Sequence, residues 1–319
     1  MQKRTAIIAT CLREVESIDT FLDAILTQTR QPDDIVIVDA GSNDGTIEKI
    51  EARIAAGAPI RLFIEPEANR SVGRNLAIEK AQAELIAVSD VGAVPERDWF
   101  EWIIALLEED EEVGVVSGYY RAEPVTLWEQ AVAAATILDV SEVDPETFLP
   151  SSRSVAFRKT LWEKAGKYPE EFNHNEDTPF DLALKETGAK FFFKPEAVVV
   201  WRPEASFRGL YRQFWRYARG DAQCGLWFKH YLKAFVMITF ILIGLCLSPI
   251  YIQALWVVGF GFILYWLRYT RRAYKRSKKI TVAFLAPVAN LILDIAHVSG
   301  YIQGLCDGGT RSPLNRVRK

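Results

Sequence analysis

One carboxylate, Asp90, closes an apolar run in the segment "AVSDVGAVP", and the position two residues later is Gly92. A site for a divalent cation and a diphosphate favours acidic side chains here, because hard cations prefer oxygen ligands. Gly92 has no side chain to offer. The segment therefore indicates either a reduced metal site or the ordinary end of a strand. Other parts of the sequence are needed to distinguish these alternatives.

The elements around Asp90 are predicted from alternating apolar runs and helix-like stretches. Runs rich in β-branched residues favour buried strands, and apolar residues at helical spacing favour the helices between them. The expected strands cover 5–10, 34–40, 60–65 and 84–90, and the expected helices 18–27, 46–56 and 72–81. This rhythm predicts an α/β fold with a mostly parallel sheet. Ligands bind at the carboxyl ends of such strands, where polar residues cluster in this chain.

Beyond residue 90 the pattern is looser. We expect a strand over 113–120, a helix near 126–139, and a pair of strands within 190–201.

Charge divides the chain into two parts. Residues 229–319 carry 13 Lys and Arg against two acidic residues, a net charge of +11, and residues 1–228 carry 25 against 39, or −14. The acidic part argues against nucleic-acid binding. The sequence has no Walker A motif and no G-x-G-x-x-G that opens a helix, which argues against ATPase, kinase and dinucleotide-binding functions. Four scattered cysteines without C-x-x-C spacing favour neither disulfides nor a metal site.

The basic part has membrane-like hydropathy. Residues 234–267 contain no charge and are interrupted by Ser248-Pro249, which favours a helical hairpin over 231–267. The stretch 268–279 holds seven basic residues, and we expect it to be a cytosolic loop on the same side as the globular part. We therefore predict a cytosolic domain over 1–228 and a multi-pass membrane region over 229–319.

The third apolar segment, 280–306, has two interpretations. It contains Asp294 and His297, and the tail 310–319 after it is again basic. A complete span would place that tail outside, against the positive-inside rule. We favour a re-entrant or interfacial segment over a third span, with both alternatives kept open.

The stretch "IVIVDAGSNDGT" (35–46) is the most specific one in the chain. An apolar strand ends at Asp39, and a glycine-containing turn leads to Asp44 and a helix. Asp39 is suited to bind a base or ribose hydroxyls, whereas Asp44 or Ser42 also fits a simple helix cap. The residues alone leave these alternatives evenly balanced.

A resemblance favours the binding interpretation. The stretch is similar to the "VVDDGSTDGT" signature of the family-2 glycosyltransferases of GT-A fold, with Ala40 in place of the second Asp. Upstream residues match the same family pattern at Thr10, Glu14, Gln28-Thr29 and Pro32. The resemblance implies that Thr10, Glu14 and Asp39 line a nucleotide pocket that Asp44 helps to shape.

The block "SVGRNLAIEKAQAELIAVSDVG" (71–92) resembles the next motif of that family. Arg74 and Asn75 stand at an expected helix N-terminus, which favours anions, and Arg74 adds fixed positive charge for a diphosphate. Asp90 matches the first acid of the D-x-D motif, and Gly92 takes the place of the second. The resemblance implies Mg²⁺ or Mn²⁺ at Asp90, with weaker or optional metal dependence.

Glu176 and Asp177 match the acidic pair of the family's acceptor block, in which an Asp opens a helix and acts as base. Inverting transfer needs a carboxylate that takes the proton of the attacking hydroxyl. Helix capping by Asp177 is the simpler alternative. His174 could be a metal ligand or a polar surface residue, and we favour the surface.

Gln213 and Arg216 fall in "QFWRY", which is similar to the family's Q-x-x-R-W motif with Tyr217 for Trp. The motif implies an Arg near the leaving diphosphate. The alternative is a basic and aromatic amphipathic helix on a membrane surface.

The resemblance covers residues 5–220 and implies an inverting glycosyltransferase. We expect the donor to be a nucleoside-diphosphate sugar, most often UDP-linked in this family. The expected acceptor is a hydroxyl of a lipid or lipid-linked glycan at the cytosolic membrane face. The alternatives are transfer to a polyprenyl phosphate, which needs no base, and a non-catalytic sugar-nucleotide-binding membrane protein.

Overall fold

The computed structural model describes residues 3–172 and 174–307 and divides the chain into two compact units. Within the described residues, the first unit comprises 3–122 and 140–201, and the second comprises 123–139 and 202–307. The chain therefore enters the second unit, returns to the first, and leaves it again after residue 201. The basic tail 310–319 lies outside the described residues.

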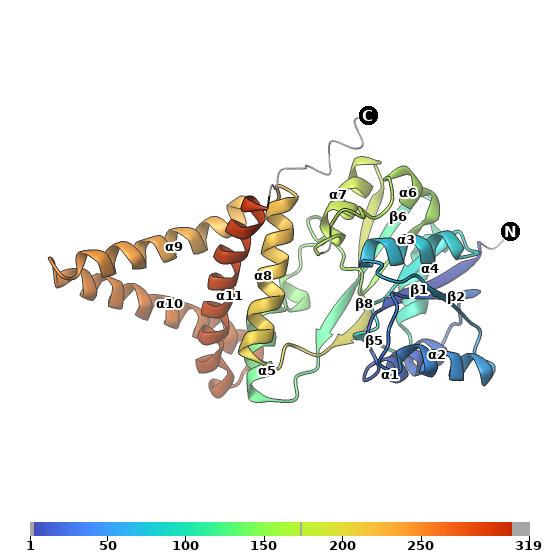
Figure 1. The fold of residues 1–319 in the computed structure, drawn as a ribbon, viewed down its shortest axis with the longest axis horizontal. Helices are drawn as coiled ribbons and strands as arrows, with labels where there is room; N and C mark the ends of the chain where they lie inside the picture. The colour runs from blue at the N-terminus through green and yellow to red at the C-terminus, as the bar shows by residue number, and fades with distance from the viewer. Residues whose placement is uncertain (1–2, 173, 308–319) are drawn as a thin grey trace. The chain divides into compact units, whose positions relative to one another are not determined.

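The first unit is built on one eight-stranded sheet, ordered β3-β2-β1-β4-β7-β6-β8-β5 (Figure 1). Its strands are β1 (Thr5–Cys11), β2 (Asp34–Asp39), β3 (Ile60–Ile64), β4 (Leu85–Val88), β5 (Ala93–Pro95), β6 (Val113–Ala122), β7 (Val155–Arg158) and β8 (Lys190–Trp201). The four strands expected over residues 5–90 are confirmed with nearly the expected bounds.

Parallel pairing aligns the strand ends that carry the polar residues. β1 pairs in parallel with β2 on one side and β4 on the other, with Thr10 opposite Val38 and Cys11 opposite Asp39. β3 extends this parallel part, whereas β7 pairs antiparallel with both β4 and β6. The carboxyl ends of β1, β2 and β4 therefore meet at one edge of the sheet.

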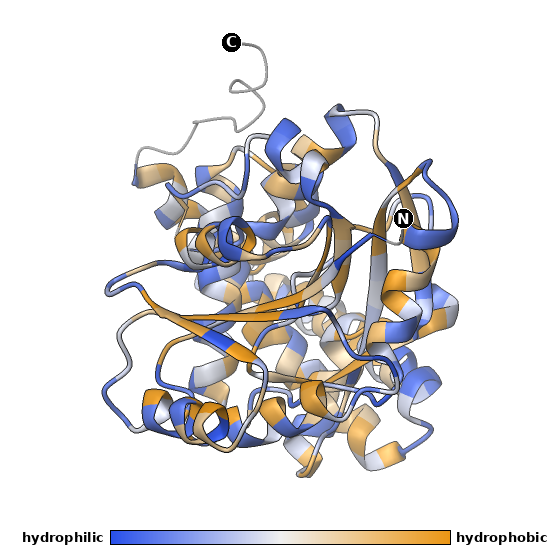
Figure 2. Cartoon of the chain, turned by 90° about the vertical axis from the view of Figure 1, so that its right-hand side faces the viewer, coloured by the Kyte–Doolittle hydropathy of each residue, from blue (hydrophilic) through white to orange (hydrophobic). Residues whose placement is uncertain are grey.

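Helices cover both faces of this sheet. Ile18–Leu26 (α1), Thr46–Ala55 (α2) and Trp99–Glu109 (α4) bury their apolar residues in one core cluster. Arg70–Lys80 (α3), Lys159–Lys164 (α6) and Asp177–Glu186 (α7) bury theirs in a second cluster on the opposite face. Figure 2 shows strands that are largely hydrophobic and helices that carry both hydrophobic and hydrophilic residues. Burial on both faces explains the continuous apolar runs of the parallel strands.

One expectation in this unit is wrong. Residues 190–201 form the single strand β8, not a pair, because the segment contains no turn. β8 runs parallel to β6, and its register shifts between Phe193 and Val198. Pro195 falls within this shift. A proline lacks the N–H that a regular ladder needs and is accommodated at such irregularities.

The second unit consists of helices. They are α5 (Leu127–Thr136), α8 (Phe207–Gln223), α9 (Phe228–Leu247), α10 (Gln253–Ser277) and α11 (Ile280–Cys306). The expected hairpin corresponds to α9 and α10. The expected loop over 268–279 is wrong, because α10 continues to Ser277. Long basic side chains are good helix formers and are favoured at helix C-termini.

Within this unit, α11 runs beside α8 and across the hairpin of α9 and α10 (Figure 1). Two glycines one helical turn apart make the contact with α8 very close. A Cβ on Gly300 would lie 2.3 Å from the Trp215 carbonyl oxygen, and one on Gly304 would lie 2.4 Å from that of Arg219. This small-residue pattern allows two helix backbones to approach closely.

We expect Gly300→Ala and Gly304→Ala each to destabilise the chain by about 1–3 kcal/mol, because the added methyl groups have no space. Gly259→Ala on α10 is the matched control, since its Cβ would meet nothing within 4 Å. Thermal unfolding of the detergent-solubilised full chain measures the difference. Equal stability of all three variants would contradict the close α8–α11 contact.

Candidate active site

The turn after β2 is organised by the buried carboxylate of Asp39. Asp39 has no exposed surface, and it accepts hydrogen bonds from the backbone N–H groups of Gly41 (2.9 Å) and Ser42 (2.6 Å) and from the Ser42 hydroxyl (2.7 Å). The Cys11 thiol lies 3.2 Å from the same carboxylate. In this structure Asp39 holds the shape of the turn after β2, and its direct contact with a nucleotide stays a prediction.

Asp44 and Glu14 join the same turn to the loop after β1. Asp44 accepts hydrogen bonds from the Thr46 hydroxyl (2.6 Å) and from the backbone N–H of Val15 (3.3 Å). These bonds, the one from the Thr46 side chain first, lower the pKa of Asp44. The backbone N–H of Glu14 donates to the Thr46 hydroxyl (2.9 Å), and its carboxylate accepts from Ser17.

Helix α3 approaches the end of β1 through a glycine. A Cβ on Gly73 would lie 2.9 Å from the Thr10 side chain, so any larger residue would push α3 away. The next residue, Arg74, thereby reaches the site. Asn75 points to the other side, where its amide NH₂ donates to Tyr168 and Glu170 and its carbonyl oxygen accepts from Trp162 and Tyr168. Its predicted contact with the donor stays a prediction.

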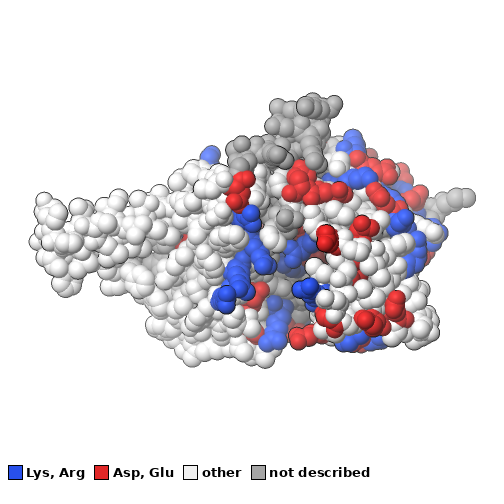
Figure 3. Space-filling model, in the orientation of Figure 1, with Lys and Arg blue, Asp and Glu red and all other residues white. Residues whose placement is uncertain are grey.

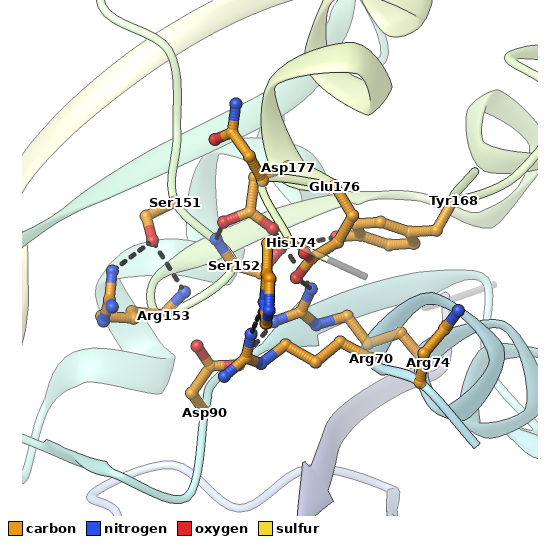
Figure 4. A network of polar contacts seen from close by, with 12 residues as sticks. Arg70, Arg74, Asp90, Ser151, Ser152, Arg153, Tyr168, His174, Glu176 and Asp177 are labelled. Carbon is orange, nitrogen blue, oxygen red and sulfur yellow. Dashed lines mark hydrogen bonds and ion pairs between the residues drawn. The ribbon is translucent and has the colours of Figure 1, made fainter. Parts of the chain in front are cut away.

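The centre of the site is a buried ion-pair cluster around Arg74 (Figure 4). Its guanidinium lies 2.7 Å from Asp90, 2.6 Å from Glu176 and 3.2 Å from Asp177. Asp90 follows β4, and the two other carboxylates stand where α7 begins. The structure thus brings together four of the residues predicted from separate sequence blocks.

Solvent reaches only two members of this cluster. The side chains of Asp90 and Asp177 are 29% and 26% exposed, whereas Arg74 is 1% and Glu176 is 5% exposed. A substrate can therefore meet Asp90 and Asp177 directly. Arg74 and Glu176 are buried behind them.

Asp177 is held in place by a neighbouring loop. Its carboxylate accepts from the Ser152 hydroxyl (2.5 Å) and backbone N–H (3.2 Å), in addition to Arg74. Burial raises the pKa of Asp177, the charge of Arg74 opposes this, and the neighbouring carboxylates Glu176 and Asp90 raise it further. The net pKa lies above the ordinary value, which increases the basicity of the ionised carboxylate.

Two arginines near Asp90 were not predicted from the sequence. Burial by itself would raise the pKa of Asp90, but the charges of Arg74, Arg153 and Arg70 outweigh it and lower the pKa. Arg153 lies over the rings of Trp201 (5.1 Å) and Tyr120 (5.9 Å). Figure 4 shows both arginines beside the cluster. The polar run "SSRS" was the only sequence signal for Arg153.

His174, which we expected on the surface, is half-buried. Its Nδ1 lies 3.4 Å from the guanidinium of Arg70 (Figure 4).

Gln213 and Arg216 lie on α8 and belong to the second unit. Gln213 donates to the Tyr217 hydroxyl (3.3 Å), and Arg216 is exposed. Their predicted place in the donor site stays a prediction.

The residues around Asp90 fit a metal ion only together with a substrate. Among residues 3–172 and 174–307, no group of three or more His, Cys, Asp and Glu side chains could hold a metal. Asp90 offers one carboxylate, and Gly92 offers none. Mg²⁺ is commonly bound by one or two carboxylates with substrate phosphates and waters. The donor set therefore suits an ion that arrives with a diphosphate.

Known proteins are similar to this chain in sequence or in fold. The family model described as Glycosyl transferase family 2 matches residues 5–163. The succinoglycan biosynthesis protein ExoA of Rhizobium meliloti is 24% identical, with 94% of each chain covered. The glycosyltransferase AglE of Haloferax volcanii is 23% identical over 76% of this chain and 82% of its own. The solved mannosyltransferase PcManGT of Pyrobaculum calidifontis, in complex with GDP-Man and Mn²⁺, aligns with a TM-score of 0.60 at 20% identity. That alignment covers 96% of this chain and 88% of PcManGT.

The sheet and its two helical layers define an α/β protein of GT-A fold, as expected from the sequence. The chain is a family-2 glycosyltransferase.

A buried acid on α7 gives a prediction on stability. Asp181 is 4% exposed, and its Oδ2 has no hydrogen-bond partner within the described residues. Burial, and then the charge of Asp177, raise its pKa well above the ordinary value. The folded chain therefore keeps a proton that the unfolded chain releases near pH 4. This contribution to stability is complete below that pH and is lost as the pH rises.

We expect Asp181→Asn to match the wild type near pH 4.5 and to be the more stable protein at pH 8, with a difference that grows with pH. Thermal unfolding across this range tests it. Glu186→Gln, at the exposed end of the same helix, should show no such trend. A pH-independent difference for Asp181→Asn would mean that Asp181 is ionised in the fold.

Proposed function

We propose that the protein is an inverting glycosyltransferase. It moves a sugar from a nucleoside-diphosphate donor to a hydroxyl of a lipid or lipid-linked glycan at the cytosolic face of a membrane. The observation that carries this proposal is the geometry of Asp177, a partly exposed carboxylate of raised pKa, held by Ser152 and Arg74 beside Asp90. ExoA, named for succinoglycan biosynthesis, supports a glycan acceptor.

Asp177 is the base of the proposed reaction. The acceptor hydroxyl attacks the anomeric carbon, Asp177 takes its proton, and the bond to the diphosphate breaks with its electron pair on the leaving oxygen. Glu176 is less suited to this role, because it is buried and paired with Arg74 at 2.6 Å. Arg74 keeps both carboxylates in place.

Positive charge for the leaving diphosphate comes from several groups. Arg70 and Arg153 lie beside Asp90. Arg216 stays a prediction of the family resemblance. Preorganised charges at the atoms where charge develops stabilise a transition state. Thr10, Glu14, Asp39 and Asp44 shape the nucleotide side of the pocket. We propose a UDP donor on the family resemblance, while PcManGT binds GDP-Man.

Asp90 would hold Mg²⁺ or Mn²⁺ when the donor is bound. The ion would neutralise diphosphate charge, as the Mn²⁺ complex of PcManGT suggests for the fold. Because Gly92 supplies no ligand, the dependence on metal is weak or optional.

The second unit supports a membrane location for the acceptor. By length and composition, α9 and α11 could each cross a membrane, with 11% and 44% of their apolar windows buried within the structure. The tip of the hairpin is apolar and exposed at Ile250 (72%) and Trp256 (77%). A lipid environment would cover these side chains, and the catalytic unit would remain cytosolic.

Asp177→Asn should lower kcat by about 10²-fold or more, because the base is lost. Affinity for the nucleoside diphosphate should remain within about threefold, since a base that acts on the acceptor contributes to the transition state rather than to donor binding. Turnover of donor and nucleotide titration measure the two effects separately, and Glu186→Gln on the same helix is the control. Full turnover by Asp177→Asn would contradict a hydroxyl acceptor and favour a phosphate acceptor.

Gly92→Asp should create a two-carboxylate metal site. A Cβ at Gly92 would meet nothing within 4 Å, and its backbone is not in the left-handed region, so the fold should tolerate the change. Titration of Mn²⁺, followed by electron paramagnetic resonance without nucleotide, should show at least about tenfold tighter binding than in the wild type, since one added carboxylate ligand strengthens a hard-cation site. Tight Mn²⁺ binding by the wild type without nucleotide would show that one carboxylate suffices.

A further inference from the structure

Helix α8 carries a row of arginines on one face. Arg208, Arg212 and Arg216 follow each other at four-residue spacing, which places them on the same side of the helix. All three are exposed. Figure 3 shows Lys and Arg side chains gathered in a line over the position that α8 has in Figure 1. We call these three residues the arginine row.

Among the described residues, no acidic side chain of the second unit pairs with the arginine row. Within its described part, no hydrogen bond or ion pair is formed by the three arginine side chains. The single acidic residue of α8, Asp221, is buried and accepts a hydrogen bond from the Tyr231 hydroxyl. At the end of the helix, Asp307 pairs with Arg219 instead. Glu204 has its carboxylate beside Gly209, next to Arg208 in the chain, but forms no ion pair with the row among the described residues. The row therefore offers positive charge that no ion pair within the described residues neutralises.

Contacts with α11 fix the direction in which this charge points. Leu210 and Ala218 are buried, and the backbone at Trp215 and Arg219 lies against Gly300 and Gly304 of α11. The helix cannot rotate about its axis without breaking this close contact. The row is thus a fixed surface.

The neighbouring hairpin indicates which anion meets this surface. α8 ends four residues before α9, and the surface of α9 and α10 is almost uncharged over most of its length (Figure 3). An exposed apolar surface of this size is typical of a contact with another protein or with a membrane. In the second unit α8 and α11 lie side by side at the base of the hairpin, and both run across it (Figure 1). A hairpin immersed in a bilayer would hold α8 at the level of the headgroups.

We infer that the arginine row binds the phosphate groups of anionic membrane lipids. Guanidinium groups match phosphate oxygens with paired hydrogen bonds, and basic residues beside an immersed segment gain affinity from an anionic leaflet. The inference does not depend on the transfer reaction. Arg208 and Arg212 have no role in the donor site proposed above, so they can be changed independently of it.

The test uses the full chain in an uncharged detergent, so that insertion of the hairpin does not contribute to binding. Dihexanoyl phosphatidylglycerol and dihexanoyl phosphatidylcholine, both below their micellar concentrations, are titrated by calorimetry. We expect the anionic lipid to bind at least about tenfold more tightly than the zwitterionic one, given the contribution of each basic residue near anionic headgroups. The double variant Arg208→Gln/Arg212→Gln should lose this preference.

Two further variants control for folding and for net charge. Arg208→Lys/Arg212→Lys should retain most of the preference, because the charge is kept. Arg97→Gln/Lys190→Gln changes the net charge equally at exposed positions of the first unit and should bind as the wild type does.

Three outcomes would overturn the inference. They are equal binding of the two lipids, unchanged phosphatidylglycerol binding by Arg208→Gln/Arg212→Gln, and full competition by inorganic phosphate at equal concentration. The last outcome would indicate a site for free phosphate, without recognition of a lipid.

Discussion

The site depends on one buried cation. A guanidinium removed from water is costly unless charged partners surround it, and Arg74 has three within 3.2 Å. Those partners come from the end of β4 and the start of α7, on different segments of the chain. The fold can therefore bury Arg74 only by bringing Asp90 and Asp177 to the same place. Gly73 makes this arrangement sterically possible, because it lets α3 approach β1.

The charge of Arg74 also affects the chemistry of Asp90 and Asp177. With Arg74 behind them, Asp90 and Asp177 can remain close together without mutual repulsion dominating, and each keeps part of its surface open. Their pKa values move in opposite directions, down for Asp90 and up for Asp177. Carboxylates whose environments separate their pKa values are suited to different roles. This separation supports the proposed roles of Asp90 in metal binding and of Asp177 in proton transfer.

The sequence predicted the strands and the candidate site residues better than it predicted the contacts between distant segments. The parallel strands were predictable because burial on both faces requires apolar runs. Asp90 and Asp177 were predicted as site residues through the family resemblance, and the structure places both beside Arg74. The convergence of both on Arg74 was not predictable, since it depends on distances between segments far apart in sequence. Arg153 stands in a loop without periodicity and is positioned by the rings of Tyr120 and Trp201, which no local pattern reveals.

The assignment of α5 to the second unit has a practical consequence for protein engineering. A soluble catalytic fragment would ordinarily be made by ending the chain near residue 201, after β8. That truncation would leave α5 behind without α10 and α11, which bury its Ala131 and Ala134. The fragment would expose the apolar face of α5 to water and would therefore tend to aggregate. A better fragment would also replace 123–139 with a short polar linker between β6 and the segment that leads to β7.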